Sequence, residues 1–407
     1  MMKGGMFPPP VLLFSNGTAL SPVEAIRMRL RPYVKLGELK LMVLTSEEVL
    51  PDTLILIKNL DEGKGIWPGF RRAFGTTISL VRRPLVTKDP YGYQSLVKEV
   101  PPNADLVLAV IPDEEMVPYE EDPYMPLKRR LSSKGIPSQM VTFSTVESLR
   151  DKGYVLLNIA LSLYAKAGGV PWVLTGRPSW DLLIGLDTSP GCIGMTLMSD
   201  WHEWSFRWDI RVNPEVEVIQ ILEDVLQDNI IAYVREKNLY PRRIVIHRDG
   251  LLFEEEIEQI TRSLHKLQYA GILPRDMKYY LIEVRKRNPA RFIRMVKAHA
   301  YTPEKGTFLQ LGDYRYLINT TGYPDLPPTL ALSPPRPITV ELVETNDWEI
   351  NFYTLAKQTY WLTALHYASA FVTPKLPIST LYPDRIASFW SAGVHPSANL
   401  RTKLWFL

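Results

Sequence analysis

DLLIGLDTSPGCIGMTLMSDWHEWSFRW (181–208) is the stretch of the chain that decides its fold. It contains three runs, at 181–187, 193–198 and 202–208, that each have the length of a strand, and the first two are largely apolar. Turn-forming residues separate the runs, and the first turn reads Asp-Thr-Ser-Pro-Gly at 187–191. Because consecutive strands joined by tight turns pair in antiparallel fashion, the stretch predicts a three-stranded antiparallel sheet.

The sequence after this stretch alternates between helical and strand patterns. Apolar residues recur on one side of the segment 217–236, which is the spacing of an amphipathic helix. The further predicted elements are a strand at 242–247, a helix at 253–267, a strand at 279–286 and helices at 350–371 and 380–391. Three antiparallel strands, a helix, a strand, a helix and a late C-terminal helix form the element order of a ribonuclease H-like fold.

The sequence before this stretch predicts a second α/β unit. Strand patterns occur at 39–45, 105–112, 140–144 and 172–174. One helix is opened by Asp122-Pro123, and another covers 146–167 and ends at Gly168-Gly169. Strands and helices that alternate with short links predict a right-handed, doubly wound layer.

We therefore expect the fold class α/β, with a Rossmann-like domain followed by a ribonuclease H-like domain. The predicted boundaries are an N-terminal segment at 1–40, in which consecutive prolines oppose regular structure, then a Rossmann-like domain at 41–170 and a ribonuclease H-like domain at 171–407.

The composition is that of a globular protein and excludes several classes of protein. The chain has 407 residues, of which 46% are apolar and 22% charged, unlike a disordered or collagenous chain. The single cysteine, Cys192, excludes an intrachain disulfide and a thiolate-rich zinc site. The net charge of +3 leaves a polyanionic partner open. No apolar run has the ~18 residues of a membrane span, so we expect a cytoplasmic chain that does not insert into membranes.

Four acidic residues lie where strand and helix ends could bring them together: Asp187, Glu217, Asp249 and Asp384. Uncompensated carboxylates at one edge of a sheet would repel one another, so such a cluster implies hard divalent cations such as Mg²⁺ or Mn²⁺. Two such ions support phosphodiester hydrolysis. The alternative is that each acid is only a turn or capping residue, because Asp favours turns and helix starts.

A second set of residues lies in the α/β unit. Tyr124 and Lys128 are four residues apart on one predicted helix, Gln139 opens a strand, and Asn158 and Lys166 share a face of the next helix. If these side chains converge, the lysines would neutralise a phosphate and the tyrosine would stack on a base. The alternative is that the lysines are part of an ordinary solvated helix face.

The segment EVEVIQILEDVLQDNIIAYVREKNLYPRRIVIHRDG (215–250) resembles the PIWI domain of Argonaute proteins. LLIGLDTS (182–189) is similar to the first catalytic strand of that family, and LPISTLYPDRIASF (376–389) to its final motif. The resemblance implies a catalytic set of Asp187, Glu217, Asp249 and Asp384, with Asp187, Asp249 and Asp384 as ligands of Mg or Mn.

YMPLKRRLSSKGIPSQ (124–139) and NIALSLYAKAGGVPW (158–172) resemble the MID domain of archaeal Argonautes that lack a PAZ domain. The resemblance implies a pocket for the 5′-phosphate of a guide strand. It also implies that the C-terminal carboxylate of Leu407 helps to hold a metal ion in that pocket. The residues of the pocket would be Tyr124, Lys128, Gln139, Asn158, Lys166 and Leu407.

The resemblance implies a PAZ-less Argonaute of the MID–PIWI type. We expect it to bind a short 5′-phosphorylated guide, RNA or DNA, to pair it with a complementary target, and to cleave that target in host defence. A chain of 407 residues has room for MID and PIWI but not for complete N and PAZ domains. A partner chain could supply these. One alternative is a cleavage-inactive, guide-dependent sensor that acts through a partner protein. Another is a ribonuclease H-like nuclease that uses no guide.

Overall fold

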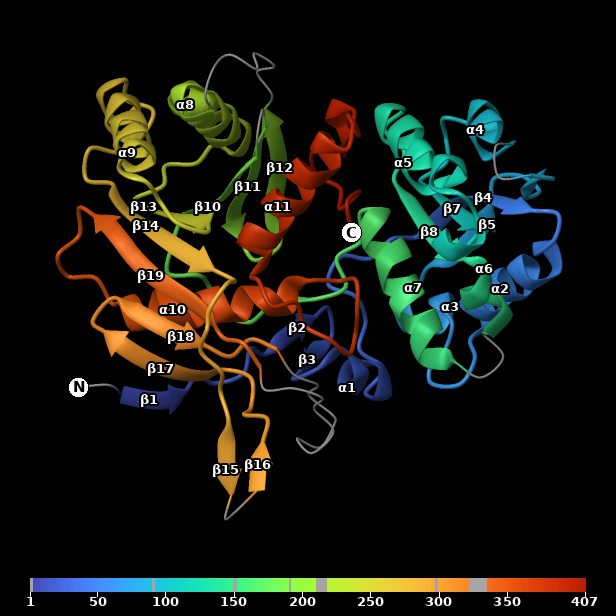
Figure 1. Ribbon diagram of the computed structural model, residues 1–407, viewed down its shortest axis with the longest axis horizontal. Coiled ribbons are helices and arrows are strands. Elements are labelled where there is room, and N and C mark those ends of the chain that lie inside the picture. Colours follow the sequence, from blue (N-terminus) through green and yellow to red (C-terminus); the bar gives the residue numbers. More distant parts are fainter. Residues whose placement is uncertain are drawn as a thin grey trace. The chain divides into compact units, whose positions relative to one another are not determined.

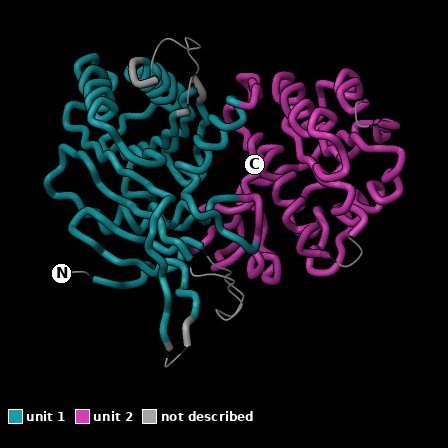
Figure 2. Tube along the Cα trace, viewed as in Figure 1, with its two compact units in different colours: residues 1–10, 174–366, 371–391 teal, residues 11–173, 367–370, 392–407 magenta. Residues whose placement is uncertain are grey.

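A computed structural model of the chain describes residues 3–89, 92–148, 152–189, 192–209, 218–296, 299–321 and 335–407. The chain divides into two compact units, coloured separately in Figure 2. Unit 1 contains residues 1–10, 174–366 and 371–391, and unit 2 contains residues 11–173, 367–370 and 392–407. Within the described residues, no helix combines the length and the apolar character needed to cross a membrane.

A nine-stranded sheet, counted over the described residues, forms the centre of unit 1 (Figure 1). The strand order is β1-β17-β18-β19-β14-β13-β10-β11-β12, and β10, β13 and β14 run parallel to one another. The strands are β1 (Lys3–Met6), β10 (Leu182–Ser189), β11 (Cys192–Asp200), β12 (Glu203–Asp209), β13 (Arg243–Asp249), β14 (Lys278–Arg285), β17 (Thr307–Gly312), β18 (Arg315–Ile318) and β19 (Ile338–Thr345). The antiparallel order β10-β11-β12 is the one that the sequence predicts.

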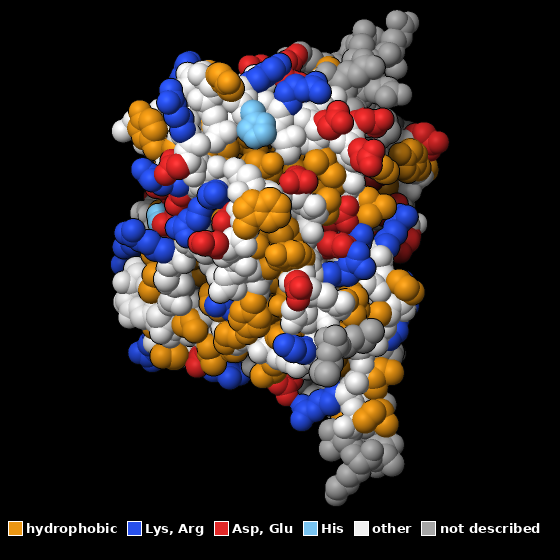
Figure 3. Space-filling model, turned by 90° about the vertical axis from the view of Figure 1, so that its left-hand side faces the viewer, with side chains coloured by type: hydrophobic (Ala, Val, Ile, Leu, Met, Phe, Trp, Pro, Cys, Tyr) orange, Lys and Arg blue, Asp and Glu red, His pale blue; other side chains and the backbone are white. Residues whose placement is uncertain are grey.

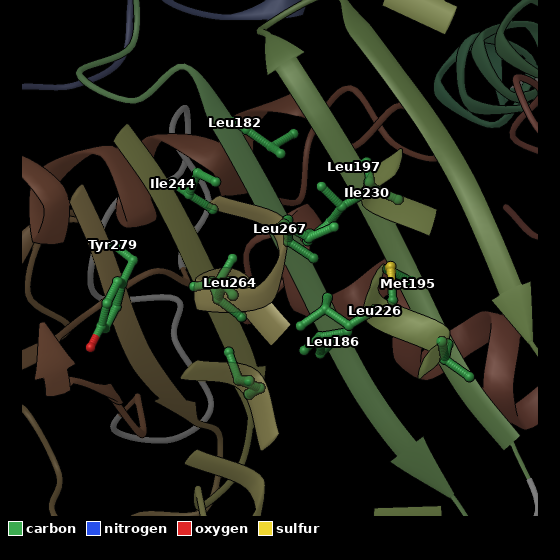
Figure 4. Close-up of a cluster of buried hydrophobic side chains, with 14 of the residues drawn as sticks. Leu182, Leu186, Met195, Leu197, Leu226, Ile230, Ile244, Leu264, Leu267 and Tyr279 are labelled. Carbon is green, nitrogen blue, oxygen red and sulfur yellow. The ribbon is translucent and has the colours of Figure 1, made fainter. Parts of the chain in front are cut away.

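Helices α8 (Val218–Lys237) and α9 (Glu254–Tyr269) pack on one face of this sheet. In β10, Leu182, Ile184 and Leu186 alternate with residues of the opposite face, and all three belong to the core under these helices (Figure 4). The apolar side of α8, with Leu226 and Ile230, fills the same core. Because side chains alternate along a strand, Leu183, Gly185 and Asp187 lie on the opposite face of β10.

The opposite face of β10 and β11 is covered by α11 (Ile378–Ser391). The helix lies so close that a Cβ atom at Gly185 would overlap the carbonyl oxygen of Ser379, and one at Gly194 would overlap that of Pro383. Because proline has no N–H, Pro383 cannot donate the usual helical hydrogen bond to the Ser379 carbonyl, and this carbonyl lies against Gly185. Two glycines therefore set the distance between α11 and the sheet.

A buried histidine holds α11 to the next strand. The Nδ1 atom of His247, on β13, lies 2.8 Å from Oγ of Ser379. Burial lowers the pKa of His247 to about 3, so its ring is neutral at pH 7. Other elements of unit 1 are α10 (Phe352–Trp361), a 3₁₀ turn (Leu362–Leu365), β15 (Arg294–Val296) and β16 (His299–Tyr301). On the face shown in Figure 3, hydrophobic side chains gather among both basic and acidic ones.

Unit 2 contains a five-stranded sheet with parallel pairing, counted over the described residues. Its order is β5-β4-β7-β8, and β6 also pairs with β4. The strands are β4 (Glu38–Ser46), β5 (Thr77–Leu80), β6 (Leu85–Thr87), β7 (Leu106–Ile111) and β8 (Ser138–Thr142). The helices are α1 (Pro22–Arg27), α2 (Leu50–Glu62), α3 (Phe70–Phe74), α4 (Tyr93–Leu96), α5 (Tyr124–Ser133), α6 (Phe143–Glu147) and α7 (Gly153–Lys166).

The structure differs from the sequence-based prediction at several elements. The sequence predicts that 172–174 joins the parallel sheet, but β9 (Val173–Leu174) neighbours β2 (Leu12–Phe14) in a separate sheet that also contains β3 (Gly17–Ala19). These short strands also show that the region before residue 41 has regular structure on both sides of its prolines. The helix predicted at 350–371 ends at Trp361, where a 3₁₀ turn begins.

We predict that Gly185→Ala destabilises the protein by about 3 kcal/mol, because the new methyl group must push α11 away from β10. Chemical denaturation of unit 1, followed by tryptophan fluorescence, measures this loss. Gly312→Ala is the matched control, since a Cβ atom there would meet no heavy atom within 4 Å. Equal stability of the two variants would contradict the close approach of α11.

Candidate functional site

Two of the predicted acids end neighbouring strands of unit 1. β10 and β13 are parallel, with Leu186 opposite Arg248, so the residues that follow, Asp187 and Asp249, lie at the same edge of the sheet. Both carboxylates are largely buried. Asp384 comes to this edge from the second turn of α11 and acts electrostatically on both of them. Glu217 lies outside the described residues.

Two cationic side chains outside the predicted set of site residues compensate the negative charge of these acids. The Nζ atom of Lys286, directly after β14, lies 2.9 Å from Oδ2 of Asp249 and 3.3 Å from Oδ1 of Asp384. Arg248 places its Nη1 atom 3.3 Å from Oδ1 of Asp187, and its Nε atom lies 3.2 Å from Oε1 of Glu256 on α9. The position of Lys286 at the end of a parallel strand is the one sequence signal that could have identified it.

The pKa values of the cluster show the cost of burying carboxylates, to which their closeness adds. Burial raises the pKa of Asp187 to about 6, against the effect of Arg248 and with a further increase from Asp249 and Asp384. Burial also raises the pKa of Asp249, although Lys286 acts to lower it. For Lys286, burial alone would lower the pKa, but Asp249 and Asp384 raise it above the usual value. The lysine is therefore charged at neutral pH.

The chemistry of this cluster fits a hard divalent cation, because its donors are carboxylate oxygens and its acids carry raised pKa values. Within the described ranges, no group of three or more His, Cys, Asp or Glu side chains is arranged to hold a metal ion. The ammonium group of Lys286 lies between two of the acids instead.

In unit 2, two of the predicted pocket residues are in direct contact. The Nζ atom of Lys166, at the end of α7, donates to Oε1 of Gln139 at 2.8 Å and to the carbonyl of Ser138 at 2.9 Å. Lys166 is only 2% exposed, so its ammonium group is held inside the unit. The αL residue Gly168 ends α7 after Lys166, as the sequence predicts.

The C-terminus of the chain is part of the same unit. Lys128, on α5 and 1% exposed, donates from Nζ to the carbonyl of Trp405. Its Nζ atom also lies 5.9 Å from the centre of the Trp405 ring. The backbone N–H of Leu407 donates to the carbonyl of Leu404 at 3.1 Å, so the last residues form a turn. The C-terminal segment therefore contacts one of the two lysines predicted for the pocket.

The two remaining pocket residues have their own contacts in unit 2. Oδ1 of Asn158, on α7, accepts a hydrogen bond from the backbone N–H of Ala370 at 2.9 Å. Tyr124 begins α5, where its backbone N–H donates to Asp122 at 2.9 Å, and its side chain packs against the core of the unit. The structure thus joins Lys166 to Gln139 directly, Lys128 to the C-terminal segment and Asn158 to the loop at 367–370.

The chain is similar to several known proteins. Residues 106–395 match the family model described as Piwi domain. The chain is 25% identical over 314 residues to a protein argonaute of Aquifex aeolicus, which covers 72% of this chain and 40% of that one. It is 26% identical over 352 residues to a protein argonaute of Thermus thermophilus, covering 82% and 47%. The chain therefore spans less than half the length of these relatives.

A solved structure is also similar over the whole chain. This is the Clostridium butyricum Argonaute bound to a guide DNA with 5′ deoxycytidine and a 19-mer target DNA, with a TM-score of 0.79 and 25% identity. The match covers 100% of this chain and 55% of that one. With the Piwi match, it confirms the expected fold class, a Rossmann-like MID domain followed by a ribonuclease H-like PIWI domain.

We predict that Lys286→Met destabilises unit 1 by about 1–2 kcal/mol at pH 8 in the presence of EDTA, less than a fully buried pair would lose, because the Lys286 side chain is 41% exposed. Without the ammonium group, the folded-state pKa values of the acids rise further above their unfolded values. The folded state then binds more protons than the unfolded state, so the deficit shrinks as the pH falls through about 6. Denaturant unfolding between pH 8 and pH 5 measures it.

The control is Lys266→Met, which removes a surface ion pair with Glu223. It should change stability by less than ~1 kcal/mol at every pH. A deficit of Lys286→Met that does not depend on pH would show that the lysine does not compensate the acids.

Proposed function

This chain belongs to the Piwi domain family, and from this premise we propose that it is a guide-dependent, nucleic-acid-binding Argonaute that cleaves a target strand paired with its guide. The observation that carries the proposal is the convergence of Asp187, Asp249 and Asp384 at one edge of the sheet. Base pairing would read the sequence of the target, and the protein would read the backbone of the duplex. A role in defence against invading nucleic acid follows as part of the proposal.

The proposed catalytic residues are Asp187, Glu217, Asp249 and Asp384. Asp187, Asp249 and Asp384 would hold Mg²⁺ or Mn²⁺, which supplies a Lewis acid for phosphodiester hydrolysis when bound. Glu217 is included on its sequence match alone. The raised pKa values of Asp187 and Asp249 support this, because acids that resist ionisation near one another gain from a divalent cation. The ammonium group of Lys286 would have to leave the acids when a cation binds.

The proposed guide-anchoring residues belong to unit 2, which we assign to the MID domain. Lys128 and Lys166 would neutralise the 5′-phosphate, Gln139 and Asn158 would donate hydrogen bonds, and Tyr124 would stack on the first base. We propose that the carboxylate of Leu407 helps to hold a divalent ion beside that phosphate. The burial of both lysines supports this role, since a buried ammonium group forms a strong charge-assisted contact with a phosphate oxygen.

The second candidate function is a cleavage-inactive sensor that binds guide and target and acts through a partner chain. One observation favours it: Lys286 lies between Asp249 and Asp384, and the described acids are not arranged around a cation site. If the ammonium group stays there after the target pairs, the site cannot take up a metal ion. The two functions therefore differ in a single measurable step.

Target cleavage decides between them. We predict that the protein with a 5′-phosphorylated guide cuts a labelled complementary target in Mn²⁺ or Mg²⁺, poorly in Ca²⁺, and not in EDTA. Asp187→Asn, Asp249→Asn and Asp384→Asn should each lower cleavage by about a hundredfold or more, because each removes several kcal/mol of electrostatic stabilisation.

The matched control for these variants is Asp276→Asn, an exposed acid paired with Arg242 at 2.6 Å, which should cut normally. Guide and target binding should survive in all four variants, since the guide-anchoring residues belong to the other unit. A wild-type protein that forms the complex but cuts neither RNA nor DNA targets would establish the sensor instead.

We predict that Lys166→Ala weakens binding of a 5′-phosphorylated guide by about tenfold to a hundredfold, because it removes a charge-assisted contact worth about 1.5–3 kcal/mol. Binding of the same guide with a 5′-hydroxyl group should change little. Equilibrium titration with labelled guides measures both affinities. Lys134→Ala is the control, because Lys134 also donates to a backbone carbonyl in unit 2, that of Val97 at 2.7 Å. Equal losses for both guides would remove Lys166 from the phosphate pocket.

A further inference from the structure

Unit 2 contains a cavity of about 530 Å³ that the proposed phosphate pocket does not use. It lies between α1 with the turn after it, α3, the middle of α7 and the segment before β9. Phe14, Phe74 and Trp172, all buried, form its aromatic wall. Four prolines stiffen the rest of the lining: Pro22, Pro32, Pro68 and Pro171. Its volume is in the range of cavities that bind small molecules.

The charged side chains around this cavity are all basic. Arg27, Arg29, Arg31 and Arg72 line it, and no acidic residue does. The two chain segments that supply them, 25–37 and 63–83, contain only basic residues among their charged positions. Within the part of the chain that the structure describes, the exposed guanidinium groups of Arg27, Arg29 and Arg72 form no ion pair with a carboxylate. The cavity is therefore an apolar hollow with an uncompensated positive rim.

The guanidinium group of Arg31 is already hydrogen-bonded within the protein and has a structural role at the rim of the cavity. Its Nη1 atom donates to the backbone carbonyls of Arg71 and Arg72 at 3.2 and 2.6 Å, at the end of α3. This contact ties the segment after α1 to α3 across the cavity. The lining is thus preformed, and Arg27, Arg29 and Arg72 remain for an anion.

Arg29 occupies a backbone position that favours glycine. Its φ is 58°, in the left-handed region, where a side chain is disfavoured. The N–H of Leu30 donates to the carbonyl of Ala25, and the N–H of Arg29 to that of Ile26, which is the pattern of a Schellman motif with Arg29 at the glycine position. An arginine at this position therefore lowers the stability of the folded protein relative to a glycine.

Other helices of this chain have glycine or asparagine at the left-handed position after the last turn. The helices α5, α7 and α9 end with a left-handed glycine, at Gly135, Gly168 and Gly271, and α8 is followed by Asn238. Among the described residues, Arg29 and Asn238 are the two non-glycine residues with positive φ, and Asn tolerates this conformation far better than Arg. An arginine kept in a strained position beside an apolar cavity points to a function for its guanidinium group.

We propose that this cavity binds one nucleotide of a single-stranded nucleic acid, with its base in the hollow and its phosphates on Arg27, Arg29 and Arg72. Guanidinium groups pair with phosphate oxygens in bidentate fashion, and they also stack on bases. Flat aromatic and proline walls suit a planar base more than a branched side chain. The site is separate from Lys128 and Lys166 and does not depend on cleavage or on a 5′-phosphate.

The first experiment uses Arg29→Gly in the full chain. The probe is a ten-nucleotide oligo(dA) with a 5′-hydroxyl and a 3′-fluorophore, followed by fluorescence anisotropy at fixed salt. The variant should bind the probe about tenfold more weakly, because a charge-assisted contact is lost. Its melting temperature should stay equal or rise, because glycine relieves the left-handed strain. Arg83→Ala, an exposed arginine outside the cavity with the same change in charge, should lose less than about twofold.

The second experiment tests whether the hollow itself takes the base. Ile26, a partly exposed residue of the lining, becomes Trp to fill the cavity without a change in charge. Ile26→Trp should weaken oligo(dA) binding about tenfold. In a competition assay with the wild-type protein, adenosine 3′-monophosphate should displace the probe at a concentration at least about tenfold lower than inorganic phosphate, since only the nucleotide carries a base.

Three results would overturn the proposal. The first is an equal loss of affinity in Arg29→Gly and Arg83→Ala, which would mean unspecific attraction. The second is unchanged binding in Ile26→Trp. The third is displacement of the probe by a short acidic peptide with an aromatic residue more effectively than by oligo(dA), which would make the occupant a protein segment. Neither the probe nor adenosine 3′-monophosphate carries a 5′-phosphate, so a failure of the guide-anchoring proposal would not be mistaken for a failure here.

Discussion

The close approach of α11 to β10 and β11 is the constraint on which the candidate catalytic site depends. Gly185 and Gly194 leave no Cβ atom between the strands and the carbonyls of Ser379 and Pro383. Any larger residue would lift the helix, and Asp384 would move with it. Because interiors are close-packed, such a shift is felt along the whole contact. The position of Asp384 in the carboxylate cluster thus depends on glycine at 185 and 194, because only glycine allows α11 to pack this close to the sheet.

The charge balance of this cluster divides into a fixed part and an exchangeable part. Arg248 is buried, is held by Glu256 on α9 and pairs with Asp187, so it belongs to the scaffold. Lys286 is 41% exposed and stands at the end of its strand, with a long side chain that can leave the acids at modest cost. A cation that enters the site therefore competes with a lysine and not with an arginine. This explains how the fold tolerates buried acids and still leaves them open to another positive charge.

Sequence patterns predicted the parts of this fold that repeat with a regular period. The strand-length runs of 181–208 and the helical spacing of 217–236 correspond to β10, β11, β12 and α8. Acids at strand ends could also be predicted, because parallel strands end at one edge. The role of Lys286, the glycines under α11 and the place of β9 in a separate sheet could not, because each depends on contacts between distant segments that leave no local period.

Unit 2 contains two buried lysines and three exposed arginines at its candidate anion sites, and this difference in burial affects which anions they attract. Lys128 and Lys166 gave up their hydration on folding, so an anion that contacts them interacts at short range and in a medium of low polarity. Before an anion contacts them, Arg27, Arg29 and Arg72 are surrounded by water, where salt screens their attraction over ~8–10 Å. Buried lysines can therefore distinguish one anion from another by geometry, whereas the exposed arginines raise the local concentration of any polyanion. Only the apolar cavity between those arginines adds a requirement of shape, because a phosphate alone gains nothing from an apolar wall.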